Sequence, residues 1–240
     1  LNPRILKTIS LLLVFLGLSM LPSSLWSIFY KEYNDIYAIV LSSSITIISG
    51  FVLYLTKYFF KEGSRKSLTS SDAFTIVTIG WILAAIFSSL PFYLSNYNLS
   101  FIDSFFESMS GLTTTGATIF GANSVFIESL SHGLLFWRSF THFLGGMGII
   151  VFSIALLPLL GIGGVQLFKA EVAGPTADKI TPRIKQTAKL LWGIYVGFVL
   201  LQCLIYYFLG MTFFDSLCHS FGTMATGGFS THSESIKYFN

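Results

Sequence analysis

Two short runs of threonine and glycine carry the residue types that could coordinate a dehydrated cation. The first is Thr113–Thr118 and the second is Ala225–Ser230. A cation that loses its water shell needs a ring of oxygens, and inward-pointing backbone carbonyls supply such a ring in channel filters. Glycine permits the backbone dihedrals that this requires, and threonine adds a hydroxyl oxygen with little bulk. The candidate ion-binding residues are Thr113, Thr114, Thr115, Gly116, Ala225, Thr226, Gly227 and Gly228.

These runs end two segments that repeat each other at a spacing of 112 residues. Residues 101–118 align without gaps onto 213–230, with six identities in 18 positions. The identical pairs are Phe101 and Phe213, Asp103 and Asp215, Ser104 and Ser216, Ser108 and Ser220, Thr114 and Thr226, and Gly116 and Gly228. Transporters are often built from internal repeats with the substrate site at their interface, so the second copy favours a permeation site.

The segments that precede the two runs, Phe101–Leu112 and Phe213–Met224, are apolar but too short to cross a membrane. A short helix followed by irregular backbone is tolerated at membrane depth only where protein buries it or where it lines a water-filled cavity. We therefore predict two re-entrant pore loops, in which each helix directs its partly negative C-terminal end at the ion. Asp103 and Asp215 lie at the helix starts and are expected to cap them rather than to attract the ion, with Ser100 at capping-box spacing.

Three ionisable residues near the loops have more than one interpretation. Glu107 and His219 align inside the two short helices. Each could approach the ion path or hydrogen-bond the back of its loop, and we favour the hydrogen bond. Arg138 could extend outward to water or pair with an acid such as Asp103, Glu107 or Glu128, and the sequence does not choose between them.

Two sets of small residues could allow helices to approach closely. We expect the run Gly145-Gly146-Met147-Gly148 to pack against a pore helix. Gly193 and Gly197 have the same type of spacing, but this pattern alone has a high false-positive rate.

The composition identifies the elements that must hold these loops. Hydrophobic residues make up 53% of the 240 and charged residues only 10%, which excludes a disordered chain and makes a soluble globule unexpected. We predict an all-α multi-pass membrane protein with five transmembrane helices plus the two pore loops. The predicted spans are Ile5–Tyr30, Ile36–Phe60, Ala73–Leu94, Leu134–Leu160 and Leu190–Leu209. The mild net charge of +3 does not indicate nucleic acid, two cysteines make no zinc site, and no enzyme motif is present.

Basic residues predict the orientation of the spans. With a cytoplasmic N-terminus, eleven of the 14 Lys and Arg residues fall on or near the inner side. The three that fall toward the outside are Lys31, Arg138 and Lys237.

Several stretches resemble one known family. Ser108–Thr118 (SMSGLTTTGAT) and Phe221–Ser230 (FGTMATGGFS) resemble the first and second filter loops of TrkH-type potassium-uptake proteins, in the Trk/Ktr/HKT superfamily. Trp137–Pro158 resembles the helix after the first filter, and Leu160–Lys189 resembles the cytoplasmic linker between the first two repeats. The resemblance covers essentially the whole chain.

The resemblance implies four repeats of helix, pore loop and helix around one pore, after an N-terminal helix pair. On this chain it implies the helix pair at 1–66, the first repeat at 72–163, the linker at 164–189, and a second repeat at 190–240 that stops after its filter loop.

The resemblance also implies a function. It implies potassium as the substrate, no cofactor, the bacterial inner membrane, and a peripheral nucleotide-binding partner of the TrkA type. Gly116 and Gly228 favour potassium over sodium, because relatives with serine at the first filter glycine tend to carry sodium. Two filter loops do not close a fourfold ring. The chain is therefore expected to act as a homodimer or with a chain carrying the C-terminal half, or to be a non-conducting truncated remnant or membrane scaffold.

Overall fold

The computed structural model describes residues 3–56, 70–121, 125–148 and 184–239, and the regular elements within these ranges are helical. In chain order they are α1 (Pro3–Phe29), α2 (Tyr33–Thr56), α3 (Ser70–Ser88), α4 (Leu90–Tyr93), α5 (Phe101–Leu112), η2 (Ile127–Ser129), α6 (His132–Phe143), η3 (Leu144–Gly148), α9 (Ile184–Phe208), α10 (Phe213–Met224) and η5 (Ser235–Phe239). The all-α class is as predicted. The second part of the predicted span Leu134–Leu160 and most of the predicted linker 164–189 lie outside the described residues.

Four helical stretches are long and apolar enough to cross a membrane. They are Pro3–Phe29, Tyr33–Thr56, Phe74–Tyr93 and Lys189–Phe208. Each matches one of the five predicted spans to within a few residues and reaches the length of about 20 residues that a membrane crossing needs. The fifth predicted span begins as α6, whose last turn continues into the π-helical turn η3.

The third of these spans is broken close to its end, where α3 gives way to the four-residue α4. Pro91 lies in the first turn of α4, where its missing N–H is tolerated, whereas inside a longer helix it would remove a backbone hydrogen bond. The Trp137 indole donates to the Ser88 carbonyl (3.0 Å), which fixes the break against α6.

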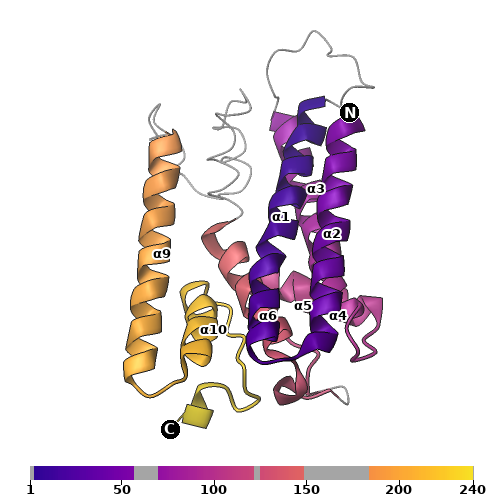
Figure 1. Cartoon of the computed structure of the whole chain (residues 1–240). Helices are drawn as coiled ribbons and strands as arrows, with labels where there is room; N and C mark the ends of the chain where they lie inside the picture. The colour runs from indigo at the N-terminus through magenta and orange to yellow at the C-terminus, as the bar shows by residue number, and fades with distance from the viewer. Residues whose placement is uncertain (1–2, 57–69, 122–124, 149–183, 240) are drawn as a thin grey trace.

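The helices form two groups that meet at α6. Figure 1 shows α1, α2 and α3 side by side, with α10 between this bundle and α9. Helix α6 contacts α1, α5 and α10 and so joins the groups, and Trp26 on α1 adds direct ring contacts with Phe213 and Phe214 on α10. Its phenylalanines Phe136, Phe140 and Phe143 each lie 5.2–5.8 Å, centroid to centroid, from the ring of Phe221 on α10.

The two short helices occupy corresponding places in the molecule. Helices α5 and α10 both have 12 residues, and both lie in the half of the molecule away from the N-terminus (Figure 1). This arrangement places the ends of α5 and α10, and the loops that follow them, beside α6.

Candidate functional site

Both short helices begin with the same cap. At α5 the Asp103 amide donates to Ser100 Oγ (3.1 Å), and this hydroxyl donates to Asp103 Oδ2 (2.7 Å). At α10 the Asp215 amide donates to Thr212 Oγ1 (3.1 Å), and that hydroxyl donates to Asp215 Oδ2 (2.6 Å). The structural role expected for both aspartates agrees with these contacts, but the groups that cap the backbone N–H are the Ser100 and Thr212 hydroxyls, and each carboxylate accepts from its hydroxyl.

Both helices also end in the same way. The Thr114 amide donates to the Gly111 carbonyl (3.0 Å), and the Thr115 amide donates to the Ser110 carbonyl (2.9 Å). The Thr226 and Gly227 amides make the equivalent bonds at 3.0 and 2.8 Å, to the carbonyls of residues 223 and 222. This pair of bonds is a Schellman motif, which turns the chain sharply at a helix end.

The turn places a threonine where glycine is usual. Thr114 and Thr226 have φ of 55° and 58°, in the left-handed region. That conformation costs about 1–2 kcal/mol for a residue with a Cβ atom, and for a β-branched residue it is a real outlier. Two residues later, Gly116 and Gly228 also have positive φ, at 76° and 88°. The same strained backbone therefore occurs twice, 112 residues apart, which is typical of functional sites.

The two loops meet at their glycines. A Cβ atom on Gly116 would collide with the backbone carbonyl of Gly227. The structure thus brings the two predicted runs, from separate parts of the sequence, into direct contact.

The oxygen-bearing groups of the loops divide into an exposed and a buried set. Thr113, Thr115, Thr226 and Gly228 are exposed in the described part of the chain. Thr114 and Gly116 are partly buried, and Ala225 and Gly227 are buried. The exposed residues carry carbonyl and hydroxyl oxygens, which are the type of ligand that hard cations prefer.

Residues inside the short helices hold the C-terminal end of each loop. The Glu107 carboxylate accepts hydrogen bonds from Thr118 Oγ1 (2.9 Å) and from the Ile119 amide (3.0 Å). At the equivalent position, His219 Nε2 lies 3.0 Å from Ser230 Oγ. Bonding to the loop, the favoured of the two predicted alternatives, is therefore what the structure shows for both residues.

Arg138 is paired with Glu107, which settles the choice that the sequence left open. Its Nε donates to Glu107 Oε1 (2.6 Å), its Nη1 donates to the Ser230 carbonyl (2.8 Å), and its guanidinium lies 3.7 Å from the centre of the Phe229 ring. Only 1% of Arg138 and 1% of Glu107 is exposed. The sequence did not indicate the contact with the second loop.

His142 and the glycines of η3 pack behind the loops. The His142 ring stacks on Phe229 at 4.1 Å and leaves no room for a Cβ atom on Gly227. A Cβ atom on Gly145 would collide with the Leu112 carbonyl, so η3 touches the end of α5. This contact agrees with the prediction that the Gly145–Gly148 run packs against a pore helix.

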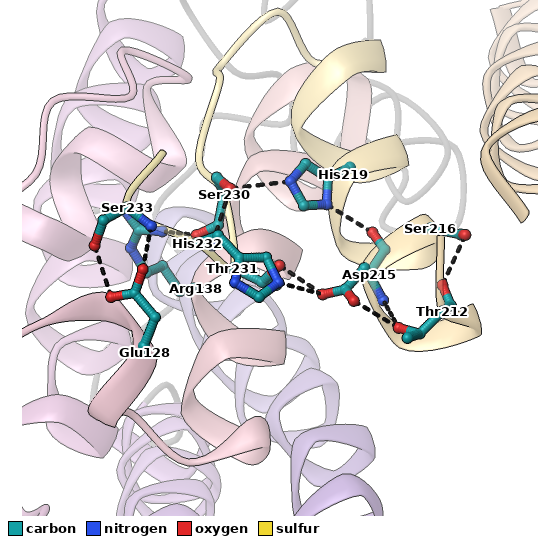
Figure 2. A network of polar contacts seen from close by, with 10 residues as sticks. All are labelled: Glu128, Arg138, Thr212, Asp215, Ser216, His219, Ser230, Thr231, His232 and Ser233. Atoms are coloured by element: carbon teal, nitrogen blue, oxygen red, sulfur yellow. Dashed lines mark hydrogen bonds and ion pairs between the residues drawn. The ribbon is translucent and has the colours of Figure 1, made fainter. Parts of the chain in front are cut away.

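A strap, residues 230–233, follows the second loop and is held by a network of polar contacts (Figure 2). Thr231 Oγ1 donates to Asp215 Oδ1 (2.6 Å), and the Ser233 amide and hydroxyl donate to the Glu128 carboxylate at 2.6 and 2.7 Å. Partial burial raises the pKa of Glu128, but these hydrogen bonds outweigh it and lower the pKa below its ordinary value. The strap was not predicted, because its two acidic partners lie 16 and 105 residues away in the sequence.

Within the described residues, no group of three or more His, Cys, Asp or Glu side chains could hold a metal ion.

Comparison with known proteins identifies the family. A sequence model of the TrkH family, described as a cation transport protein, matches residues 39–240. The chain belongs to this family. A TrkH potassium uptake protein of Vibrio parahaemolyticus is 41% identical over 238 residues, which are 98% of this chain and 47% of that protein. The TrkG potassium uptake protein of Escherichia coli is 43% identical over 227 residues, which are 93% of this chain and 45% of that protein.

A solved TrkH structure has the same fold. The crystal structure of the potassium transporter TrkH from Vibrio parahaemolyticus superimposes with a TM-score of 0.78 at 37% identity, over 99% of this chain and 46% of that chain. This chain thus spans about half the length of the TrkH relatives that it matches. These relatives are named as transport proteins rather than enzymes, and the apolar helices agree with a membrane protein.

Proposed function

We propose that this chain supplies part of the pore of a potassium uptake system, with residues 113–118 and 225–230 as two of its selectivity-filter segments. One observation carries the proposal: the two segments share a left-handed threonine followed by a positive-φ glycine, and they meet at Gly116 and Gly227. The names of the relatives, which are potassium uptake proteins, support potassium as the ion.

The proposed architecture has five membrane spans, with α5 and α10 as re-entrant pore helices. Residues 1–66 form the N-terminal helix pair, 72–163 the first repeat, 164–189 a cytoplasmic linker, and 190–240 the second repeat up to its filter. The N-terminus faces the cytoplasm, and the membrane is the bacterial inner membrane. The basic residues support this orientation.

The pore needs further filter segments to surround the ion. We propose that a second copy of this chain, or a chain carrying the C-terminal half, supplies them, and that a TrkA-type nucleotide-binding subunit docks on the cytoplasmic side. This chain matches 45–47% of the length of these two relatives.

Rubidium uptake tests the proposal. Cells that lack their own potassium uptake would express this chain alone, or together with the remaining C-terminal part of the Vibrio parahaemolyticus TrkH, and a membrane blot would confirm the protein. Uptake above the empty vector in either arm supports a pore segment, and the arm that succeeds identifies the complement. Absence of uptake in both arms, with the protein present, contradicts the proposal and leaves a non-conducting remnant.

Two glycine variants test the filter. In Gly116→Ser the new side chain has an unfavourable positive φ and also collides with the Gly227 carbonyl. In Gly228→Ala the positive φ is again unfavourable, but the added Cβ atom has no neighbour within 4 Å. We expect both to lower the preference for rubidium over sodium, by about tenfold where ~1.4 kcal/mol of discrimination is lost. Gly210→Ala is the matched control, because Gly210 also has positive φ (101°) and open space but lies outside the loops. An unchanged preference for rubidium over sodium in the two loop variants would contradict the filter assignment.

A further inference from the structure

The two loops are each fastened to their own helix, but a different residue joins them to one another. Glu107 holds Thr118 and Ile119 of the first loop, and His219 holds Ser230 of the second. None of these three bonds crosses from one loop to the other.

Arg138 makes the crossing contact. It lies on α6, and its Nε binds Glu107 of α5 while its Nη1 binds the carbonyl of Ser230 in the second loop. The guanidinium face covers Phe229, which precedes Ser230 in the second loop. One side chain thus touches the helix that holds the first loop and the backbone of the second.

The geometry of the guanidinium matters here more than its charge. Its donors diverge in a fixed plane, so the directions of the bonds to Glu107 and Ser230 are set together. A lysine ammonium is a single point of charge on a flexible stem and does not impose that angle.

Stability alone is a poor explanation for such a pair. Removing two charges from water is expensive, and replacing a buried ion pair by apolar groups is often neutral or stabilising. The Arg138–Glu107 pair is nearly fully buried, and it lies between the two loops rather than at a helix surface. This position favours a role in fixing geometry.

We infer that Arg138 is a positioning residue, which sets the spacing between the outer ends of the two loops and thereby the ion preference of the pore. It acts through Glu107 and Ser230 and does not itself touch the ion. The inference rests on the proposed function, because ion preference has meaning only where the loops are filter segments.

The decisive variant removes both charges at once. In the double variant Glu107→Gln with Arg138→Met no buried charge is left unpaired, and the introduced glutamine keeps an oxygen to accept from Thr118. This variant loses the bond to the Ser230 carbonyl, and it also loses one of the two bonds to the first loop, because a glutamine has a single oxygen for Thr118 Oγ1 and the Ile119 amide. Its readout is therefore the second loop. Arg138→Lys is the second variant, because it retains the charge for Glu107 but not the fixed fork. Lys237→Gln is the control, since Lys237 is an exposed cation near the outer strap.

Amide hydrogen exchange of the full chain in detergent measures the contact directly. We expect the peptides covering 113–121 and 225–234 to exchange about tenfold faster in both test variants, because a buried hydrogen bond from a charged donor is lost. Peptides from α1 and α2 should exchange as in the wild type, whereas a general loss of stability would raise exchange there too. Unchanged exchange in both loops overturns the inference, whatever the transport result.

Rubidium and sodium uptake then tests the consequence, in whichever arm the wild type conducts. A lower rubidium preference in the test variants, with Lys237→Gln unchanged, supports the inference. A wild-type preference in the double variant, together with faster loop exchange, overturns it. If the wild type takes up no rubidium but loop exchange still rises in the variants, the contact between the loops stands and the pore proposal fails.

Discussion

Thr226 tests whether the backbone strain of the loops serves function. Thr226 has φ of 58°, which a glycine adopts without the steric penalty of a Cβ atom. We therefore expect Thr226→Gly to raise the unfolding temperature by about 2–4 °C, equivalent to roughly 1 kcal/mol. We expect the same variant to lower the preference for rubidium over sodium, because it removes a hydroxyl oxygen and gives the loop backbone more conformational freedom. Thermal unfolding in detergent and the uptake ratio measure the two effects.

The control for this prediction is Thr223→Gly, three residues earlier on α10. Thr223 lies within the helix, where glycine is unfavourable, and its Oγ1 lies 2.9 Å from Tyr206 Oη, so this variant should lower the unfolding temperature. A Thr226→Gly variant that also unfolds at lower temperature would show that the side chain stabilises the loop, and the strain argument would be wrong.

Residue types alone predicted part of this site. The alignment at a spacing of 112 residues found the two threonine and glycine runs and paired Glu107 with His219. The bonds of these two residues to the loops were the favoured of two alternatives. The left-handed threonines did not, because threonine seldom adopts that conformation and the Schellman turn usually carries glycine. The partner of Arg138 did not follow either, since several acids were equally plausible and only the packing of α6 against α5 selects Glu107.

At the scale of elements, the contact of η3 with α5 predicts opposite effects for two glycines. A Cβ atom on Gly145 would collide with the Leu112 carbonyl, so Gly145→Ala should destabilise the protein by about 1–3 kcal/mol. On α9, a Cβ atom added to Gly193 would have no neighbour within 4 Å, so Gly193→Ala should stabilise the helix by up to about 1 kcal/mol. Thermal unfolding of both variants in detergent measures the difference.

A Gly145→Ala variant that unfolds at the wild-type temperature or higher would contradict the close contact between η3 and α5. The contact itself was predictable, because a run of glycines beside a pore helix favours close approach. The break between α3 and α4 was not predicted, since hydropathy counts Pro91 within an apolar run and does not register its missing N–H.

At the scale of the whole molecule, composition predicted the class and hydropathy predicted four of the spans that the structure describes. What composition does not predict is the packing of α10 between α9 and the first bundle (Figure 1). That arrangement depends on aromatic contacts such as Phe136 with Phe221, between residues far apart in the sequence.

The orientation in the membrane gives the last prediction. Asn34 and Glu234 are exposed, and the α1–α2 corner and the C-terminal strap lie at one end of the molecule, while α9 begins at the other (Figure 1). With a cytoplasmic N-terminus, cysteines introduced as Asn34→Cys and Glu234→Cys should react with a membrane-impermeant maleimide added to intact spheroplasts. Lys189→Cys, at the start of the apolar span within α9, should react only after permeabilisation, because the basic residues near it are retained inside. The native thiols Cys203 and Cys218 are buried, so their background labelling should be low.

Labelling of Lys189→Cys in intact spheroplasts, with Asn34→Cys protected, would reverse the orientation and place both loop entrances on the cytoplasmic side.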